Sequence, residues 1–336
     1  MAFKVLLTER VSKVGMDMLA EKAEVVVSPS PADADLLPLI ADADGMLIRS
    51  TDLGAAMLEA GKRLKVVGRH GIGVDSIDLK AATRLGIMVV NTPGANTNAV
   101  AEHALWAIMH CARNFNRVEA AFRAGKFCVA GSLPGLVQKM GFTTLELKGK
   151  TLGLVGMGRI ARRLAEITGK CLQMQVRSYD PLVPDEAFAS LGVQRARSLD
   201  ETLIGADFVS LHVPHMPETH HLIGKRELAL LKKSACLINS SRGGIVDEAA
   251  LYEALKEKRI AGAALDVFEQ EPPSRDLPFF GLDNVLVTPH MAAMTDLALI
   301  NMSQDVATGI LDALEGRRPQ YLANPEVWDQ LKKAGP

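Results

Sequence analysis

The sequence predicts an α/β fold with two doubly wound parallel-sheet domains and an interdomain cleft. Short apolar runs alternate with amphipathic stretches from end to end, which is typical of repeated βα units. Ala, Val, Leu and Gly abound while aromatic residues make up 4% of the chain, a composition unlike that of a β-sandwich. The length of 336 residues is enough for two domains of ordinary size.

The N-terminal part of the chain contains the first series of βα units. Its predicted strands are Lys4–Leu7, Gly45–Ile48, Leu64–Val67 and Ile87–Val90. A long amphipathic helix is then predicted over Asn98–Ala124, because apolar residues recur along one face. The irregular segment Gly125–Gly149 follows it, either as a surface connection or as an arm that reaches a second copy. We expect the helix and the arm, with exposed Leu133, Leu136 and Val137, to bury against a symmetry mate in a homodimer.

A second series of βα units begins at Thr151. Its predicted strands are Thr151–Val155, Gln175–Tyr179, Phe208–His212, Cys236–Asn239, Ala261–Leu265 and Val285–Thr288. Directly after the first strand, Gly156, Gly158 and Ala161 form a G-x-G-x-x-A pattern that opens a helix, as in dinucleotide-binding turns. Asp180 ends the next strand, 24 residues after Gly156, where a carboxylate accepts hydrogen bonds from ribose hydroxyls and repels a 2′-phosphate. The pattern favours NAD as cofactor, the alternatives being an ordinary glycine turn and a solvated aspartate.

The position of this glycine pattern in the chain predicts that the dinucleotide-binding domain is inserted into another domain. Another α/β unit precedes it, and a last helix near Asp296–Gly316 follows the final strand. We expect residues 100–290 to form a Rossmann domain that binds NAD. Residues 1–99 and 291–336 are expected to form a discontinuous, flavodoxin-like substrate-binding domain, with the substrate in the cleft.

Three charged residues follow strands of the second series: Arg242, Glu271 and His290. The carboxyl ends of parallel strands border the ligand crevice, so these side chains are predicted to lie beside the nicotinamide. Histidine can protonate a new alkoxide, a carboxylate stabilises the imidazolium, and arginine holds a substrate carboxylate. The combination indicates hydride transfer to a 2-oxo acid. Taken singly, Arg242 could instead pair with Asp247, Glu271 could be a solvated acid, and His290 could be a buried histidine.

Charge and cysteine content argue against several classes of protein. The net charge is −1, which gives no indication of a nucleic-acid or membrane partner. The four cysteines form no C-x-x-C pair, and the N-terminus predicts a strand rather than a signal peptide, so we expect a cytoplasmic protein. Four histidines cluster without a Cys or acid at ligand spacing, so no metal site is predicted: His212, His215, His220 and His221. His212 is instead expected near the cofactor ribose.

From residue 4 to residue 319 the chain resembles the D-isomer-specific 2-hydroxyacid dehydrogenase family. The matching segments are Arg69–Asp75, Asn91–Pro93, Gly156–Ile160, Asn239–Asp247, Ala264–Pro272 and Thr288–Ala293. The resemblance implies that Arg242, Glu271 and His290 are catalytic and that Asp266 contacts the nicotinamide amide. It implies further NAD contacts at Arg159, Ile160, Asp180, His212, Val213, Pro214, Ser240, Ser241, His290, Ala292 and Ala293. It implies substrate contacts at Arg49, Ser50, Arg69, His70, Gly71, Ile72, Gly73 and Arg242, with the backbone of residues 71–73 on the substrate carboxylate.

Within the family, Arg49, Ser50 and Arg69 are similar to the phosphoglycerate dehydrogenase branch, where two arginines face an anionic tail. His70 and Ile72 depart from that branch, which has a small residue and a threonine there, and the segment 127–140 looks longer. We predict a three-carbon D-2-hydroxy acid with a second polar or anionic group as substrate, with glyoxylate or hydroxypyruvate reduction as the alternative. The chain ends 46 residues after His290, so no appended regulatory domain is expected.

Three other classes of function remain as alternatives. A non-catalytic, NAD-sensing corepressor-like protein would bind NADH without turnover. A formate dehydrogenase would carry Gln where this chain has Glu271. An NAD-binding structural module would need neither the histidine nor the carboxylate.

Overall fold

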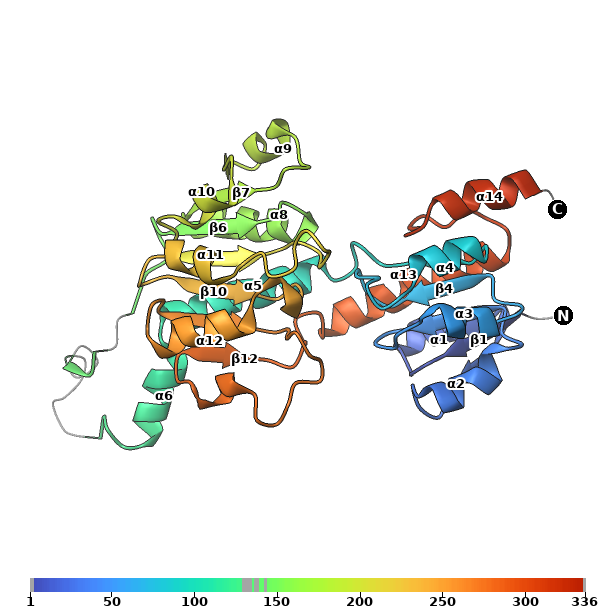
Figure 1. Cartoon of the computed structure of the whole chain (residues 1–336), viewed down its shortest axis with the longest axis horizontal. Coiled ribbons are helices and arrows are strands. Elements are labelled where there is room, and N and C mark those ends of the chain that lie inside the picture. Colours follow the sequence, from blue (N-terminus) through green and yellow to red (C-terminus); the bar gives the residue numbers. More distant parts are fainter. Residues whose placement is uncertain (1–2, 129–134, 136–138, 142–143, 335–336) are drawn as a thin grey trace. The chain divides into compact units, whose positions relative to one another are not determined.

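The computed structural model describes residues 3–128, 135, 139–141 and 144–334. The chain divides into two compact units, one made of Met1–Thr97 and Ala293–Pro336 and the other of Asn98–Ala292 (Figure 1). Leu133, Leu136 and Val137, predicted to be exposed on the arm, lie outside the described residues.

The first unit is built on a sheet with the strand order β2-β1-β3-β4-β5, in which every described pairing is parallel. The strands are β1 (Phe3–Leu7), β2 (Ala23–Val27), β3 (Gly45–Ile48), β4 (Val66–Arg69) and β5 (Met88–Val90). The sequence did not predict β2, an edge strand in which only Ala23 is fully buried. The strand order reverses between β1 and β3, so the crevice outside their carboxyl ends is the expected ligand position of this sheet.

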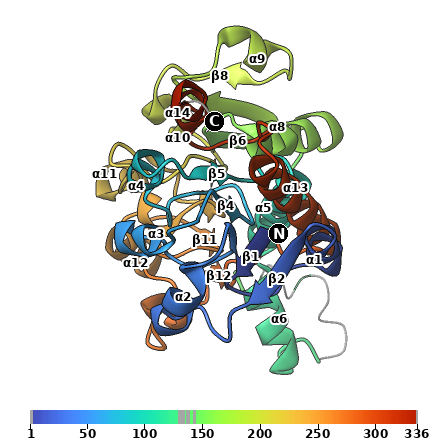
Figure 2. The ribbon, with the colours of Figure 1, turned by 90° about the vertical axis from the view of Figure 1, so that its right-hand side faces the viewer.

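Helices cover both faces of this sheet. They are α1 (Lys13–Ala20), α2 (Asp33–Ile40), α3 (Ala55–Ala60), α4 (Leu79–Arg84), α13 (Asp296–Leu314) and α14 (Glu326–Ala334). Although α1 and α13 are far apart in sequence, they lie side by side (Figure 2). A Cβ on Gly68 would lie 2.6 Å from side-chain carbons of Val306 and Ile310, so α13 packs directly on the backbone of β4. The last helix therefore belongs to the first unit.

The second unit has the strand order β12-β11-β10-β9-β6-β7-β8, again with parallel pairings throughout the described residues. The strands are β6 (Thr151–Val155), β7 (Gln175–Tyr179), β8 (Gln194–Arg195), β9 (Phe208–Leu211), β10 (Cys236–Asn239), β11 (Gly262–Leu265) and β12 (Val285–Val287). The two-residue strand β8 is too short to leave an apolar pattern and was not predicted. The predicted fold class of two doubly wound parallel-sheet domains is confirmed.

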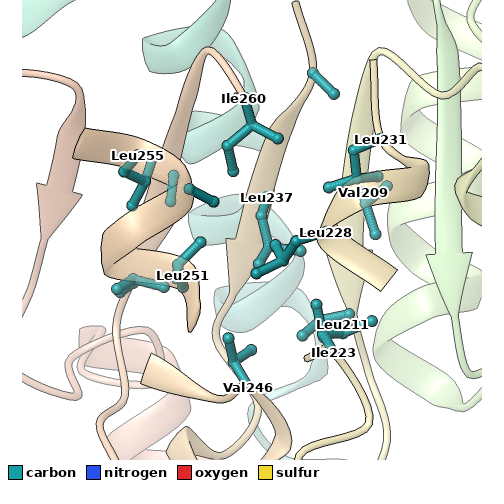
Figure 3. Close-up of a cluster of buried hydrophobic side chains, with 14 of the residues drawn as sticks. Val209, Leu211, Ile223, Leu228, Leu231, Leu237, Val246, Leu251, Leu255 and Ile260 are labelled. Atoms are coloured by element: carbon teal, nitrogen blue, oxygen red, sulfur yellow. The ribbon is translucent and has the colours of Figure 1, made fainter. Parts of the chain in front are cut away.

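Apolar side chains fill the space between this sheet and its helices. On one face, leucines of α11 (Lys225–Leu230) and α12 (Glu248–Lys256) pack against Val209, Leu211 and Leu237 (Figure 3). A second cluster joins small and apolar residues of α5 (Thr97–Ala112) and α8 (Arg159–Glu166) to β6 and β9. The unit also contains two short helices, α9 (Asp185–Ala189) and α10 (Leu199–Leu203). Burial on both faces explains why the central strands read as continuous apolar runs.

The predicted continuous helix over Asn98–Ala124 is wrong. The structure has α5 and a separate helix, α6 (Phe115–Arg123), because Asn114 adopts a left-handed conformation with φ +50°. Asparagine tolerates this conformation better than most residues, so a single position ends one helix and begins the next without disturbing the apolar period. Over the described residues, no helix has both the length and the apolar character needed to cross a membrane.

Candidate active site

The glycine turn lies at the carboxyl ends of β6 and β9, where the strand order of the second sheet reverses. Gly156 has φ +93°, and a Cβ there would lie 2.6 Å from the carbonyl oxygen of His212, so no other residue fits. Gly158 is different, because nothing among the described residues lies within 4 Å of its would-be Cβ. Ala161 is fully buried in the core beneath the turn. The protein itself does not require glycine at position 158, but a pyrophosphate approaching the backbone does.

Asp180 follows β7 and faces this turn. Its Oδ2 accepts a hydrogen bond from Met157 N at 2.8 Å, and its Oδ1 accepts one from Leu182 N at 2.9 Å. Each oxygen keeps a second lone pair, and the residue is half-buried, so ribose hydroxyls can still bind. The turn, the helix N-terminus and the acid together fit an NAD cofactor.

His290 and Glu271 form a hydrogen-bonded pair at the carboxyl ends of β11 and β12. His290 Nδ1 lies 2.6 Å from Glu271 Oε2, and Glu271 Oε1 accepts a hydrogen bond from Phe268 N at 3.0 Å. Burial would raise the pKa of Glu271, but the hydrogen bond and charge of His290, helped by Phe268 N and by the charge of Arg242, hold it below its ordinary value. His290 is 49% exposed, and its Nε2 has no partner among the described residues. The ring therefore presents Nε2 to a ligand.

Arg242 follows β10 and is close enough for its charge to act on Glu271. Two residues that sequence reasoning missed shape its loop. Asn239 is buried, and its side chain bonds to Arg242 O at 2.9 Å and to Ser241 N at 3.1 Å. A Cβ on Gly243 would lie 1.8 Å from the carbonyl carbon of Phe268, so only glycine lets this loop pack against the loop of Glu271. In the sequence, only the dipeptide Gly243-Gly244 indicated that this loop packs closely against another.

Asp266 holds the loop that carries His290. Its buried carboxylate accepts hydrogen bonds from Thr288 Oγ1 at 2.6 Å, Met291 N at 2.8 Å and Ala292 N at 2.9 Å. Its carbonyl accepts one from His290 N at 2.7 Å, which fixes His290 at φ +50°, a conformation that a non-glycine residue rarely adopts. His103 on α5 lies behind the cluster, 3.8 Å from Asp266 Oδ1. Asp266 therefore positions the loop of His290, in addition to the nicotinamide contact that the resemblance implies.

Of the other residues expected to contact NAD, Arg159 and Ile160 begin α8, Ala292 and Ala293 follow β12, and the rest lie at the ends of β9 and β10 or on the loops after them. Ser241 Oγ donates to Val213 O at 3.0 Å and ties the two loops together. His212 bonds to Ser210 Oγ at 2.9 Å, and burial lowers the pKa of its imidazole to about 4, so it is neutral at physiological pH.

The other histidines of the predicted cluster bond to each other or to an acid. His215 Nε2 lies 3.1 Å from His220 Nδ1, and His221 Nε2 lies 2.9 Å from Glu269 Oε1. Within the ranges that the structure describes, no group of three or more Cys, His, Asp or Glu is arranged to hold a metal ion.

The first unit carries the loop 69–73 at the carboxyl end of β4. Ile72 N and Gly73 N make no hydrogen bond within the described residues, while Asn91 Nδ2 holds the Ile72 carbonyl at 2.8 Å. These two donors fit a carboxylate. The expected substrate contact at His70 stays a prediction. Its side chain is 3% exposed, and its Nε2 bonds to Ser303 Oγ on α13 at 3.0 Å.

The side chains of Arg49 and Ser50 follow β3, and both contact an acid that sequence reasoning missed. Glu9, after β1, accepts a hydrogen bond from Ser50 Oγ at 2.9 Å, and its Oε2 lies 3.8 Å from Arg49 Nη1. Arg69 turns back on its own loop, with Nη1 donating to His70 O at 2.6 Å. No motif marks Glu9, since its place next to Arg49 follows only from the pairing of β1 with β3.

Comparison with protein families matches residues 105–292 to the D-isomer specific 2-hydroxyacid dehydrogenase, NAD binding domain. The chain is 40% identical over 322 residues to the D-3-phosphoglycerate dehydrogenase of Methanocaldococcus jannaschii, covering 96% of this chain and 59% of that protein. It is 37% identical over 328 residues to the glyoxylate reductase of Korarchaeum cryptofilum, covering 96% of each. The crystal structure of TT0316 protein from Thermus thermophilus matches with a TM-score of 0.84 at 34% identity, covering 96% of this chain and 100% of that one.

The chain thus spans less than two thirds of the length of the phosphoglycerate dehydrogenase that it matches. The match to the family's cofactor domain covers more than half of the chain and includes the glycine turn, Asp180 and the His290–Glu271 pair. The chain belongs to the D-isomer-specific 2-hydroxyacid dehydrogenase family, and residues 105–292 are its NAD-binding domain.

Proposed function

We propose that this chain is an NAD-dependent oxidoreductase that interconverts a D-2-hydroxy acid and its 2-oxo acid. The observation that carries the proposal is the His290–Glu271 pair on the NAD-binding domain, with the ring's Nε2 presented to a ligand. A protein that only senses NADH needs no such pair.

The bound nicotinamide would supply the hydride in one direction and accept it in the other. In reduction, His290 Nε2 gives its proton to the carbonyl oxygen as C2 gains the hydride, so that C=O becomes CH–OH. In oxidation, the neutral ring takes that proton back. Glu271 holds the ring through Nδ1 and balances the imidazolium charge. Arg242 binds the substrate carboxylate and polarises the carbonyl.

On the first unit, the N–H groups of Ile72 and Gly73 are proposed to bind a substrate carboxylate. Arg49 and Arg69 support a three-carbon substrate with a second polar or anionic group on C3. Glyoxylate reduction is the second candidate, because a glyoxylate reductase and a phosphoglycerate dehydrogenase match this chain at similar identity.

The test is the absorbance at 340 nm of NADH mixed with the protein and, in turn, glyoxylate, hydroxypyruvate and its 3-phosphate. Oxidation of NADH with any of these acids supports the proposal, and their kcat/KM values rank the substrates. NADH binding by fluorescence without turnover of any 2-oxo acid would contradict it and favour a sensor.

We also propose that the chain forms a homodimer through α5 and α6. Four large apolar side chains on these helices are 45–58% exposed: Trp106, Met109, Phe115 and Phe122. Large apolar side chains that remain this exposed on two consecutive helices are typical of a protein interface. Light scattering at micromolar concentration is expected to give twice the mass of the chain, and a monomer would contradict this proposal.

A further inference from the structure

The carboxyl ends of β1 and β3 form a polar site of mixed charge in the first unit. Glu9 follows β1, and Arg49 and Ser50 follow β3, on the two sides of the point where the strand order reverses. Ligands of open α/β sheets bind in this crevice. The side chains of Arg49 and Glu9 are 28% and 32% exposed, so a small ligand can reach both.

Two further hydroxyls at these strand ends lack a partner. Thr8 Oγ1 and Thr51 Oγ1 are buried, and neither has a hydrogen bond among the described residues. Buried polar atoms in folded proteins are normally hydrogen-bonded, so an unpaired buried hydroxyl is unusual. Here two of them lie at the same end of one sheet. They add polar character to the site without adding charge.

Arg49 also neighbours the loop proposed to bind the substrate carboxylate. Arg49 directly follows Ile48, which pairs with Arg69 in the sheet and accepts a hydrogen bond from His70 N at 2.8 Å, so Arg49 begins beside the loop 69–73. A short acid held by Ile72 N and Gly73 N therefore has Arg49, Ser50 and Glu9 as neighbours on the same unit.

We propose that Glu9 determines substrate specificity, so that the enzyme prefers a 2-oxo acid with an uncharged hydroxyl on C3 over the same acid carrying a phosphate there. This inference rests on the proposed function. A C3 hydroxyl can donate to the Glu9 carboxylate and accept from Arg49 or Ser50, so each group of the site finds a partner. A phosphate has charge and acceptor oxygens but few protons to donate, and it meets the like charge of Glu9. Arg49, already beside Glu9, offsets this repulsion only in part.

The experiment compares kcat/KM for hydroxypyruvate and for its 3-phosphate in the wild type, Glu9→Gln and Asp52→Asn. Each value is expressed relative to glyoxylate, which has no group on C3 and so corrects for any general loss of activity. Asp52 is an exposed carboxylate two residues after Ser50, and neither the Ser50–Glu9 hydrogen bond nor the Arg49–Glu9 ion pair involves it, so its variant controls for the loss of one negative charge.

The wild type is expected to prefer hydroxypyruvate. Glu9→Gln removes the charge but keeps the length of the side chain, and should shift the ratio toward the phosphate by about 10- to 100-fold, the range of a close charge contact. Asp52→Asn should leave the ratio unchanged. A wild type that prefers the phosphate, or equal shifts in both variants, would overturn the role of Glu9.

Failure of the proposed function and failure of the role of Glu9 give different results. If no 2-oxo acid is reduced by the wild type, the proposed function fails and Glu9 has no substrate to select. If Glu9→Gln does not fold, Ser50→Ala tests the same site, because it removes the hydroxyl that bonds to Glu9. Ser50→Ala should lower kcat/KM for hydroxypyruvate relative to glyoxylate, and an unchanged ratio would count against the site.

Discussion

His290 Nδ1 and Glu271 Oε2 lie 2.6 Å apart, although the two residues follow different strands of the second sheet. The contact decides which ring nitrogen is available: the carboxylate takes Nδ1, so Nε2 carries the proton that a substrate can receive. Burial would raise the pKa of Glu271, but the hydrogen bond and charge of His290 hold it below its ordinary value. Glu271 is therefore a carboxylate at neutral pH, and it gains a proton only as pH falls through its lowered pKa.

Asp180→Ser should narrow the preference for NADH over NADPH. The serine still accepts a hydrogen bond near Met157 N but no longer repels a 2′-phosphate. The free-energy difference that corresponds to the ratio of kcat/KM values for NADH and NADPH is expected to change by about 1–3 kcal/mol. Glu186→Ser removes an exposed carboxylate from α9 and serves as the control. Equal efficiency with both cofactors in the wild type would contradict the role of Asp180.

Arg69→Ala should raise KM for a 2-oxo acid with a polar group on C3 far more than KM for glyoxylate. The reason is that the side chain would bind the substrate's tail and not the reacting carbon. Steady-state kinetics with hydroxypyruvate and glyoxylate measure the difference. If both substrates suffer alike, Arg69 only braces its loop through its bond to His70 O.

His70→Gln should make the protein more resistant to mild acid. Burial and the charge of Arg49 lower the pKa of His70 to about 4 from an ordinary 6.5. As pH falls, His70 therefore gains its proton at a higher pH in the unfolded chain than in the folded protein. Stability linked to this group is lost as pH falls from about 6.5 to 4, by roughly 3 kcal/mol at most. Thermal midpoints over this range should fall less steeply in His70→Gln, whose amide can still bond to Ser303. His221→Gln, at an exposed histidine, is the control, and equal slopes in wild type and His70→Gln would contradict the burial argument.

Much of the fold could be predicted because strands buried on both faces must be apolar along their length. The edge strand β2 was not predicted because four of its five residues are exposed or only partly buried. The break between α5 and α6 was not predicted because one left-handed residue, Asn114, leaves the apolar period intact. In the site, Arg242, Glu271 and His290 follow from the rule that ligands bind at carboxyl ends of strands. Glu9 and the loop contact at Gly243 depend on which loops meet, and local sequence does not encode that.

The pH dependence of kcat for 2-oxo acid reduction, measured in the wild type and in Glu271→Gln, tests the proton-transfer role of the pair most directly. Reduction by the wild type should fall as pH rises and the imidazolium loses its proton. In Glu271→Gln this fall should move to lower pH, because the imidazolium has lost its counter-charge. His290→Ala should lose roughly 10²–10⁴ in kcat while still binding NADH, which separates the acid from the cofactor site. A profile that stays in place in Glu271→Gln would contradict the proposed catalytic pair.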